Sequence, residues 1–479
     1  MMSLSLFLPE TVLCALITLY LCLTLIKNAP SARTLANLAG ISATAVLAAT
    51  VFSLNASGEL FGGTYRVDLL AQCFKAIIAL GLLFTVFLSG DAVALPRTRL
   101  IEYHLFLASS ALGMMMIPSS VNLLTLYVSL ELSSYSLYLL TALRQDRRNA
   151  ESSIKYLVLG AAASGFFLWG ASLVIGLSGN ASLAEIARQT ATLSLEPAFF
   201  LGLVFILFSF LFKLSAFPLH FWAADVYESA ATPVTTFIAT ASKAAAIAVL
   251  IRVLSSSGVS LGLASLLGVF AFISMTLGNA VALVQKDVKR LLAYSSIAQA
   301  GYILVGLLAG TPDAYACSLF YALAYLLMNA GVFFVLSLVG KSAKKDNPQL
   351  SDFDGLAERA PKLALLLLLS LLSLAGIPPL IGFTGKWILF AASMDQGHWF
   401  LVLWAVLNSV VSLFYYLSLV RHAYLEKPVP GAPALVVTLP MKLLGLGLLL
   451  AIVLLGVFPA PAISLAQRAC LPVTQAVGL

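Results

Sequence analysis

The amino-acid sequence predicts an all-α, polytopic membrane protein with about fourteen transmembrane helices. Its 479 residues are 61% hydrophobic and only 10% charged, whereas a soluble domain carries roughly 25% charged residues. A chain of this length could not cover a water-exposed surface with so few charges. Apolar runs near the length of about 20 residues that crosses a bilayer occupy about 4–26, 35–54, 67–89, 101–117, 119–142, 151–178, 197–219, 233–254, 259–283, 290–310, 313–340, 361–394, 398–420 and 440–465.

The first apolar run is expected to remain in the protein as a helix. The segment Met1–Leu8 has no basic residues, and no small-residue cleavage site follows the run, so a signal peptide is not indicated. The five cysteines are scattered and form no CxxC pair. We therefore expect neither an iron–sulfur cluster nor a zinc site, and no cofactor in this chain.

The distribution of basic residues predicts the orientation of the chain. Nineteen Lys and Arg residues lie in or beside the loops that follow odd-numbered spans, and four lie on the other side. Basic residues concentrate in cytoplasmic loops, so both termini are predicted to be periplasmic. This bias also explains the net charge of +7, and no nucleic-acid partner is expected.

The remaining four of the 27 basic residues lie inside apolar spans, together with one glutamate. They are Lys75, Lys213, Lys243, Lys386 and Glu131. A charge at the bilayer centre costs about 2.5–3.5 kcal/mol on insertion scales, and such residues are usually functional. For Lys75, snorkelling of the side chain to the interface is an equally good explanation. The other four are predicted to be stations of a proton relay.

Two predicted spans are interrupted beside these lysines. Pro218 follows Lys213, and Pro378 and Pro379 precede Lys386. Proline removes a helical hydrogen bond, and non-helical backbone at membrane depth persists only where it is buried in protein or lines a wet cavity. Broken helices in corresponding positions of two halves indicate a transport site.

Polar residues also recur at helical spacing in three spans. Such stripes face either packed helices or a line of water, and the sequence leaves both explanations open. The stripes are Thr236, Thr240 and Lys243; Ser295, Gln299 and Tyr302; and Tyr321, Tyr325 and Asn329.

Five stretches of this sequence resemble a known family. They are EYHLFLASSALGMMMIPSSVNLLTLYVSLELSSYSLYLL, RRNAESSIKYLVLGAAASGFFLWG, FKLSAFPLHFWAADVYESAATPVTTFIATASKAAAIAVL, DVKRLLAYSSIAQAGYILVGL and LSLAGIPPLIGFTGKWILF. Together they cover most of residues 100–395 and resemble subunit N of respiratory complex I (subunit 2 in mitochondria), within the antiporter-like superfamily. The GIPPLIGFTGK segment points to subunit N, because the sister subunit M usually has a glutamate where this chain has Lys386.

The resemblance implies two inverted five-helix repeats, each with one broken helix. The expected units are an N-terminal three-helix segment (1–100), a first repeat (101–255), a second repeat (256–427) and a C-terminal helix (428–479). Glu131 and Lys213 resemble the pair of the first half-channel, Lys243 the central lysine, and Lys386 the lysine of the second half-channel. His220 and Lys289 also match family positions. Gln299 stands where subunit N often has histidine, and glutamine does not titrate.

The function implied is proton translocation in NADH:quinone oxidoreductase, coupled to quinone reduction on partner subunits. NADH, flavin, iron–sulfur clusters and quinone are expected on those partners, which include the small subunit K, subunits M and L, and the lateral helix of L. The expected location is the bacterial inner membrane. The alternatives are a multi-subunit Na⁺/H⁺ antiporter, a ferredoxin-, F420- or hydrogenase-linked relative, and a scaffold without transport.

Overall fold

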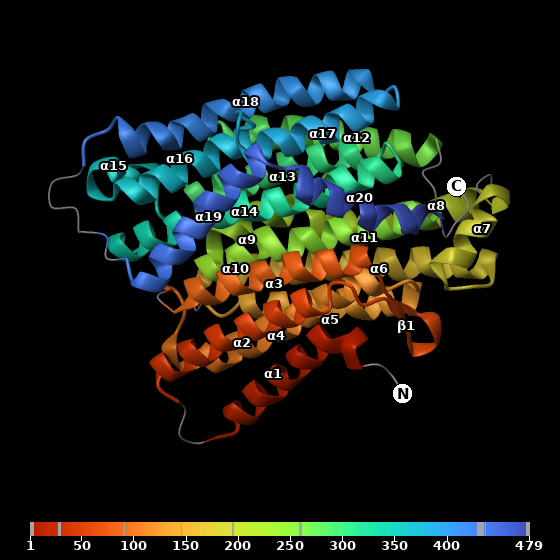
Figure 1. Ribbon diagram of the computed structural model, residues 1–479, viewed down its shortest axis with the longest axis horizontal. Coiled ribbons are helices and arrows are strands. Elements are labelled where there is room, and N and C mark those ends of the chain that lie inside the picture. The colour runs from red at the N-terminus through yellow and green to blue at the C-terminus, as the bar shows by residue number, and fades with distance from the viewer. Residues whose placement is uncertain are drawn as a thin grey trace.

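The computed structural model describes residues 4–26, 30–90, 92–144, 146–193, 196–257, 261–428, 435 and 437–475. Most of the long helices run lengthwise, close to the long axis of the molecule (Figure 1). Among the described residues, twelve helices are long and apolar enough to cross a membrane. The prediction of a nearly all-helical, polytopic membrane protein is therefore confirmed.

The N-terminal segment contains three long helices and a small hairpin. Its elements are η1 (Leu4–Phe7), α1 (Leu8–Thr24), α2 (Ala32–Phe52), β1 (Gly58–Leu60), η2 (Phe61–Gly63), β2 (Tyr65–Val67) and α3 (Leu69–Ser89). The two strands are antiparallel and pair Gly58 with Val67. This hairpin was not predicted from the sequence. Its turn uses Gly62 and Gly63, which have positive φ angles of 67° and 83° that glycine adopts without steric cost.

The middle of the chain forms a helical block with one interrupted helix. Its elements are η3 (Arg97–Arg99), α4 (Leu100–Met116), η4 (Ile117–Ser119), α5 (Leu123–Thr141), α6 (Arg147–Ser178), α7 (Leu183–Leu193), α8 (Pro197–Leu214), α9 (Phe221–Ser229), α10 (Thr232–Phe237), the π-helix η5 (Ile238–Ser242) and α11 (Lys243–Ser257).

A second helical block, also with an interrupted helix, completes the chain. Its elements are α12 (Leu261–Ala282), α13 (Val288–Leu307), α14 (Pro312–Ala343), η6 (Leu350–Phe353), α15 (Leu356–Arg359), α16 (Pro361–Ala375), α17 (Ile381–Asp395), α18 (Trp399–Tyr424), α19 (Leu439–Val457) and α20 (Ala460–Gln475).

Twelve of the fourteen predicted spans coincide with these apolar helices, and two differ. The range 290–310 corresponds to α13, a 20-residue helix whose sequence includes Lys289, Arg290 and Gln299. The range 361–394 divides into α16 and α17, each of 15 residues. Neither half is long enough to cross the bilayer as one regular helix. The predicted C-terminal helix is also divided, at Phe458, into α19 and α20.

One end of the bundle holds the described ends of the chain, and the other holds loops rich in basic residues (Figure 1). Helix α1 begins and α20 ends at one end, here called the termini end, and α15 lies near the opposite end (Figure 1). At that opposite end, here called the basic end, ion pairs such as Arg144–Asp346 and Lys289–Asp346 join segments 142–144, 286–290 and 341–360. Lys27, which the sequence analysis counted with the basic loops, lies outside the described residues.

The centre of the bundle is formed by α10–α11 and α14. The apolar window within Thr232–Ser255 is 100% buried and that within Pro312–Ala343 is 89% buried, against 22% for the windows in α1 and α19. A helix that is apolar on all sides is stable where every side meets protein or lipid. Alanines make up much of α11 (KAAAIAVLI), and their small side chains allow neighbouring helices to approach closely.

The two helical blocks share several local features. Helices α6 and α14 both have 32 residues. Helices α8 and α16 each end where a residue has left-handed backbone, Ser215 with φ 54° and Gly376 with φ 90°. Each is followed by a second helix that continues after the break. The breaks lie where the prolines predicted them, with Phe217–Pro218 and Pro378–Pro379 as cis peptide bonds.

Candidate functional site: buried lysines at two helix breaks

Lys213 lies in the last turn of α8, just before the first break. Its side chain is buried, and its Nζ donates a hydrogen bond to Ser133 Oγ on α5 at 2.7 Å. Glu131 lies on α5 two residues before Ser133, is half-buried, and accepts a hydrogen bond from Ser164 Oγ on α6 at 2.5 Å. The part of the chain that the structure describes contains no ion pair between Lys213 and Glu131. The two charges are thus neighbours on α5 and α8 that bind separate serines.

Lys243 lies directly after the π-helix η5 and contacts the same break. Its Nζ donates hydrogen bonds to the Leu214 carbonyl and to Ser215 Oγ. The end of α8 leaves carbonyls without a helical partner, and the ammonium of Lys243 satisfies one of them. Short π-helical segments are frequent at functional sites. Lys243 therefore binds Leu214 and Ser215, the two residues that directly follow Lys213 at the break.

The polar stripe predicted beside Lys243 packs against its own helix. Thr236 Oγ1 donates to the Thr232 carbonyl at 2.8 Å, and Thr240 Oγ1 donates to the Thr236 carbonyl at 2.6 Å. Threonine often forms such bonds to the preceding turn. These bonds use the two threonine hydroxyl protons within the helix itself.

Lys386 lies on α17 and reaches back across the second break. Its Nζ donates to the Leu374 carbonyl at 2.8 Å, to the Ala375 carbonyl at 3.3 Å and to Ser409 Oγ at 2.8 Å. The ammonium also lies 4.6 Å from the centre of the Tyr302 ring. The side chain is only 4% exposed. The break thus supplies Lys386 with carbonyl acceptors inside the apolar bundle.

Gln299 shares an acceptor with Lys386. Its Nε2 donates to the Leu374 carbonyl at 3.1 Å and to Tyr416 Oη at 3.4 Å. Its Oε1 accepts from Tyr321 Oη at 2.5 Å, and Ser295 Oγ lies 2.5 Å from Tyr416 Oη. The predicted stripes of α13 and α14 therefore meet at Gln299, which links them to the second break. Tyr416 was not identified from the sequence.

A further buried network, also not identified from the sequence, lies behind Tyr302. Asn279 Nδ2 donates to Tyr302 Oη at 3.1 Å and to Asn408 Oδ1 at 3.1 Å. Tyr415 Oη donates to Asn279 Oδ1 at 3.0 Å. The only signal in the sequence is the presence of amides within predicted spans, which is weak because amides also serve as packing contacts.

Lys289 and His220 occupy different surroundings from the four relay candidates. Lys289 is fully buried at the basic end, where its Nζ donates to Asp346 Oδ2 at 2.6 Å and to the Ala230 carbonyl at 2.9 Å. His220 precedes α9 and lies beside the rings of Phe217 and Phe221. Lys289 thus holds a fixed contact between the two helical blocks.

Asp346 is the centre of that contact. It lies after α14, accepts from Arg144 Nη1 at 3.1 Å and from the Thr232 amide at 3.2 Å, and is 6% exposed at the side chain. Burial raises the pKa of Asp346, but the Lys289 ammonium and the hydrogen bonds from Lys289 and Thr232 outweigh it, so the pKa is lowered overall. The carboxylate therefore remains ionised at neutral pH and keeps the two blocks joined at the basic end.

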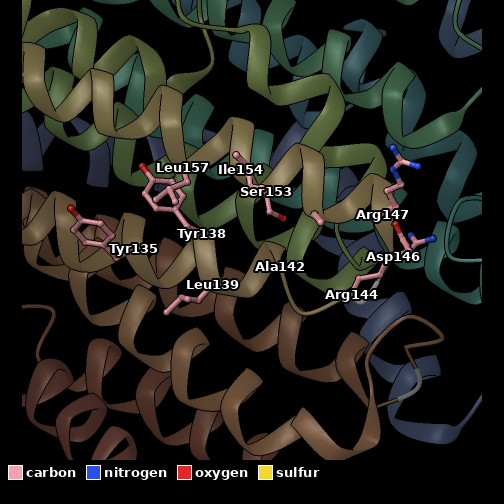
Figure 2. Close-up of a pocket in the computed structure, with 11 residues that line it drawn as sticks. Tyr135, Tyr138, Leu139, Ala142, Arg144, Asp146, Arg147, Ser153, Ile154 and Leu157 are labelled. Atoms are coloured by element: carbon pink, nitrogen blue, oxygen red, sulfur yellow. The ribbon is translucent and has the colours of Figure 1, made fainter.

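The groove beside Glu131 is apolar. A groove of about 620 Å³ lies between α5 and α6, lined by Leu139, Ile154 and Leu157 and by the rings of Tyr135 and Tyr138, with arginines toward the basic end (Figure 2). Tyr135 is one turn beyond Glu131 on α5. This face of the first block is suited to lipid or to another apolar protein surface, and the buried lysines do not line it.

Comparisons with known proteins place the chain among membrane subunits. Residues 120–412 match the family described as NADH:quinone oxidoreductase/Mrp antiporter, TM. The chain is 45% identical over 425 residues to NADH-quinone oxidoreductase subunit N 2 of Syntrophobacter fumaroxidans, covering 88% of this chain and 90% of the relative.

Two solved structures have the same fold. A chain of respiratory complex I from Thermus thermophilus superposes with a TM-score of 0.84 at 32% identity, covering 96% of this chain and 99% of that one. A chain of the Mrp complex from Dietzia sp. superposes with a TM-score of 0.88 at 20% identity, covering 99% and 100%. The second likeness concerns the fold alone.

Proposed function

The chain belongs to the NADH:quinone oxidoreductase/Mrp antiporter family, and from this membership we propose a specific proton route through its interior. Its function is that of a proton-translocating subunit N of NADH-quinone oxidoreductase, a translocase subunit of complex I. An antiporter component is not favoured, because the identity is 45% with a subunit N and 20% with the Mrp chain. The chain assembles with other membrane-arm subunits.

One observation carries the proposed route. At each of the two helix breaks, a buried lysine ammonium binds a serine hydroxyl and carbonyls at the end of a helix: Lys243 at the first break and Lys386 at the second. All of these acceptors are neutral, so no carboxylate of the described residues binds either lysine and holds it in its charged form. A buried lysine whose charge can be changed by a neighbour is suited to pass protons.

The route we propose has four stations. Protons pass among Glu131, Lys213, Lys243 and Lys386, with Gln299 and its tyrosines beside the last station. His220 and Lys289 have supporting roles, Lys289 by holding the blocks together through Asp346. Pro218, Pro378 and Pro379 interrupt the helices so that carbonyls become available to the ammonium groups. Because Gln299 does not titrate, it can relay a proton only by hydrogen bonding to water or tyrosine.

The proposal includes two inverted repeats, spanning 101–255 and 256–427, between an N-terminal segment (1–100) and a C-terminal one (428–479). Its support is the equal length of α6 and α14 and the similar break after α8 and α16. A second similarity is a close helix approach in each block. A Cβ on Gly113 would lie 2.4 Å from the Ser133 amide of α5, and one on Gly278 would lie 2.5 Å from the Ala298 amide of α13.

We further propose that subunits K, M and L, with the lateral helix of L, are the neighbours of this chain in a bacterial inner membrane. Electron transfer from NADH through flavin and iron–sulfur clusters to quinone would then take place on partner subunits. The apolar α5–α6 face beside Glu131 is available for such a neighbour or for lipid.

Changing Lys243 tests the route. Lys243→Met keeps a long apolar side chain but removes the ammonium that binds the break. Positioned proton-transfer groups contribute typically about 10²–10⁴-fold, so NADH-driven proton pumping in membrane vesicles should fall at least about tenfold. Lys442→Met, on the exposed face of α19, is the matched control and should pump normally. Normal pumping by an assembled Lys243→Met complex would refute the route.

The termini end is predicted to face the periplasm. Ser57→Cys beside the hairpin and Ser351→Cys in η6 both put a thiol at an exposed position, one near each end. In a background with Cys14 and Cys22 replaced by alanine, an impermeant thiol reagent should label Ser57→Cys on intact spheroplasts. It should label Ser351→Cys only after the membrane is opened. The reverse pattern would invert the topology.

A further inference from the structure

A second buried charge pair lies in the N-terminal segment, outside the route described above. Glu10 on α1 and Lys75 on α3 are both 0% exposed, and Lys75 Nζ lies 2.7 Å from Glu10 Oε1. Tyr65 of the hairpin donates its hydroxyl to the same oxygen at 2.7 Å, and its ring lies 5.3 Å from the ammonium. The Lys75 ammonium is therefore enclosed by protein and paired with a carboxylate. Glu10, near the start of the first apolar run, was not identified from the sequence.

The pair does not use all of its hydrogen-bonding capacity. Among the described residues, Glu10 Oε2 has no hydrogen-bond partner, Lys75 Nζ makes none beyond its ion pair, and Gln72 Nε2 of α3 also has none. Buried polar atoms are nearly always hydrogen-bonded, by protein or by ordered water. Burying two charges costs desolvation free energy, which is offset only when their remaining lone pairs and N–H groups also form hydrogen bonds. An unfilled acceptor on Glu10 and unfilled donor capacity on Lys75, at one ion pair, indicate a hydrated site.

Three buried serines lie between the hairpin beside this site and Lys213. Tyr65 pairs through its backbone with Ser120, whose Oγ lies 3.2 Å from Ser129 Oγ on α5. Ser129 and Ser133 are one turn apart on the same face of α5, about 6 Å along the axis. Ser133 Oγ accepts the hydrogen bond of Lys213. The three serines are 0% exposed, so they lie in the protein interior. Each hydroxyl also donates to a carbonyl of the preceding turn, Ser120 to Met116, Ser129 to Thr125 and Ser133 to Leu130. Proton transfer along them therefore requires these hydroxyls to rotate.

Close packing of α4 against α5 keeps this line of serines narrow. Gly113 of α4 faces the Ser133 amide, and Ser110 Oγ of α4 donates to the Ser133 carbonyl at 3.0 Å. Small residues at this seam leave room for hydroxyl groups but not for large side chains. The remaining gap of one helical turn is short enough for bridging water.

We propose that Glu10, Lys75 and Tyr65 form an additional protonatable site, joined to Lys213 by the α4–α5 serines, through which the first block exchanges protons with the termini end. This inference rests on the proposed role of Lys213. In the transfer, the Lys213 ammonium becomes an amine and the Glu10 carboxylate becomes a carboxylic acid. The proton moves along the serine hydroxyls and intervening water, and no other bond changes. Neutral Glu10 then no longer pairs with Lys75, which frees the ammonium to release a proton toward the termini end.

The test removes both charges together in the complete complex in native membranes. Glu10→Gln with Lys75→Met keeps the side-chain sizes and leaves no unpaired buried charge. We expect near-normal assembly on native gels and a loss of protons pumped per NADH oxidised. Ser129→Ala, a smaller change, should cause the same loss without affecting assembly. A full proton yield in either assembled variant would overturn the inference.

A matched control separates this role from a structural one. Asp68, the N-cap of α3, and Arg252 of α11 form another ion pair, in which Arg252 is buried and Asp68 is partly exposed, with hydrogen bonds of 2.7 and 2.8 Å. Arg252 also donates to the Pro118 carbonyl, and no serine hydroxyl joins this pair to Lys213 in the contacts above. Asp68→Asn with Arg252→Met should lower assembly and leave the proton yield of the assembled fraction unchanged. If the control and the Glu10–Lys75 variant lose only assembly, the Glu10–Lys75 pair is structural and the inference fails. The proposed route has its own test: it is refuted if the Lys243→Met complex retains normal pumping, whatever the Glu10–Lys75 variant does.

Discussion

Replacing Lys386 by methionine should leave the complex assembled while NADH-driven pumping and coupled quinone reduction fall at least about tenfold. This bound lies below the about 10²–10⁴-fold that a positioned proton-transfer group contributes. Assembly should survive because the acceptors of Lys386 have other donors. The Leu374 carbonyl keeps the hydrogen bond from Gln299 Nε2 at 3.1 Å, and the Ala375 carbonyl keeps the one from Ser409 Oγ at 3.0 Å. Methionine fills most of the space of the lysine chain.

Lys386→Arg distinguishes a relay from a fixed charge. Arginine keeps the positive charge but does not release its proton in proteins. A relay lysine is therefore poorly replaced by arginine, and pumping should fall as in the methionine variant. A Cβ on Gly376 would lie 3.2 Å from Lys386 Cδ, so the site is tight and assembly must be measured alongside. Full pumping by a well-assembled arginine variant would contradict the relay role, and Lys442→Arg serves as the control.

Glu131 and Lys213 should behave as one functional unit. We expect Glu131→Gln and Lys213→Met each to reduce pumping by at least about tenfold, and the double variant to be little worse than the more damaged single variant. Residues that act in one step lose function only once, so their effects do not add. The measurement is proton pumping per NADH for the four proteins of the cycle.

The structure makes this prediction sharper. The two side chains bind different serines, Ser164 and Ser133, and form no direct ion pair in the described residues. Coupling between them would therefore pass through water or through a change in the position of Glu131. Losses that multiply would show independent action and would remove Glu131 from the route. Combining Lys213→Met with the exposed Lys442→Met provides a pair whose effects should multiply.

The pattern of apolar runs was sufficient to predict most of the fold. A bilayer requires about 20 apolar residues for each helix and internal satisfaction of every backbone group, so membrane spans can be recognised from local composition. Both breaks were predicted for the same local reason, since proline cannot continue the hydrogen-bond ladder. Lys213 and Lys386 lie beside these breaks in sequence, which is why they could be identified without any structure.

Contacts between distant residues required the folded chain. Glu10 and Lys75 lie on different helices, and a short hydrophobic segment shows nothing of its partner in another helix. Asp346 likewise resembled an ordinary loop aspartate, yet it joins Lys289 of one block to Thr232 of the other. The composition of the chain therefore specifies that it spans the membrane and where its helices break. Which charges meet inside depends on helix packing, because a hydrogen bond or ion pair needs its atoms within about 4 Å and sequence distance does not report such proximity.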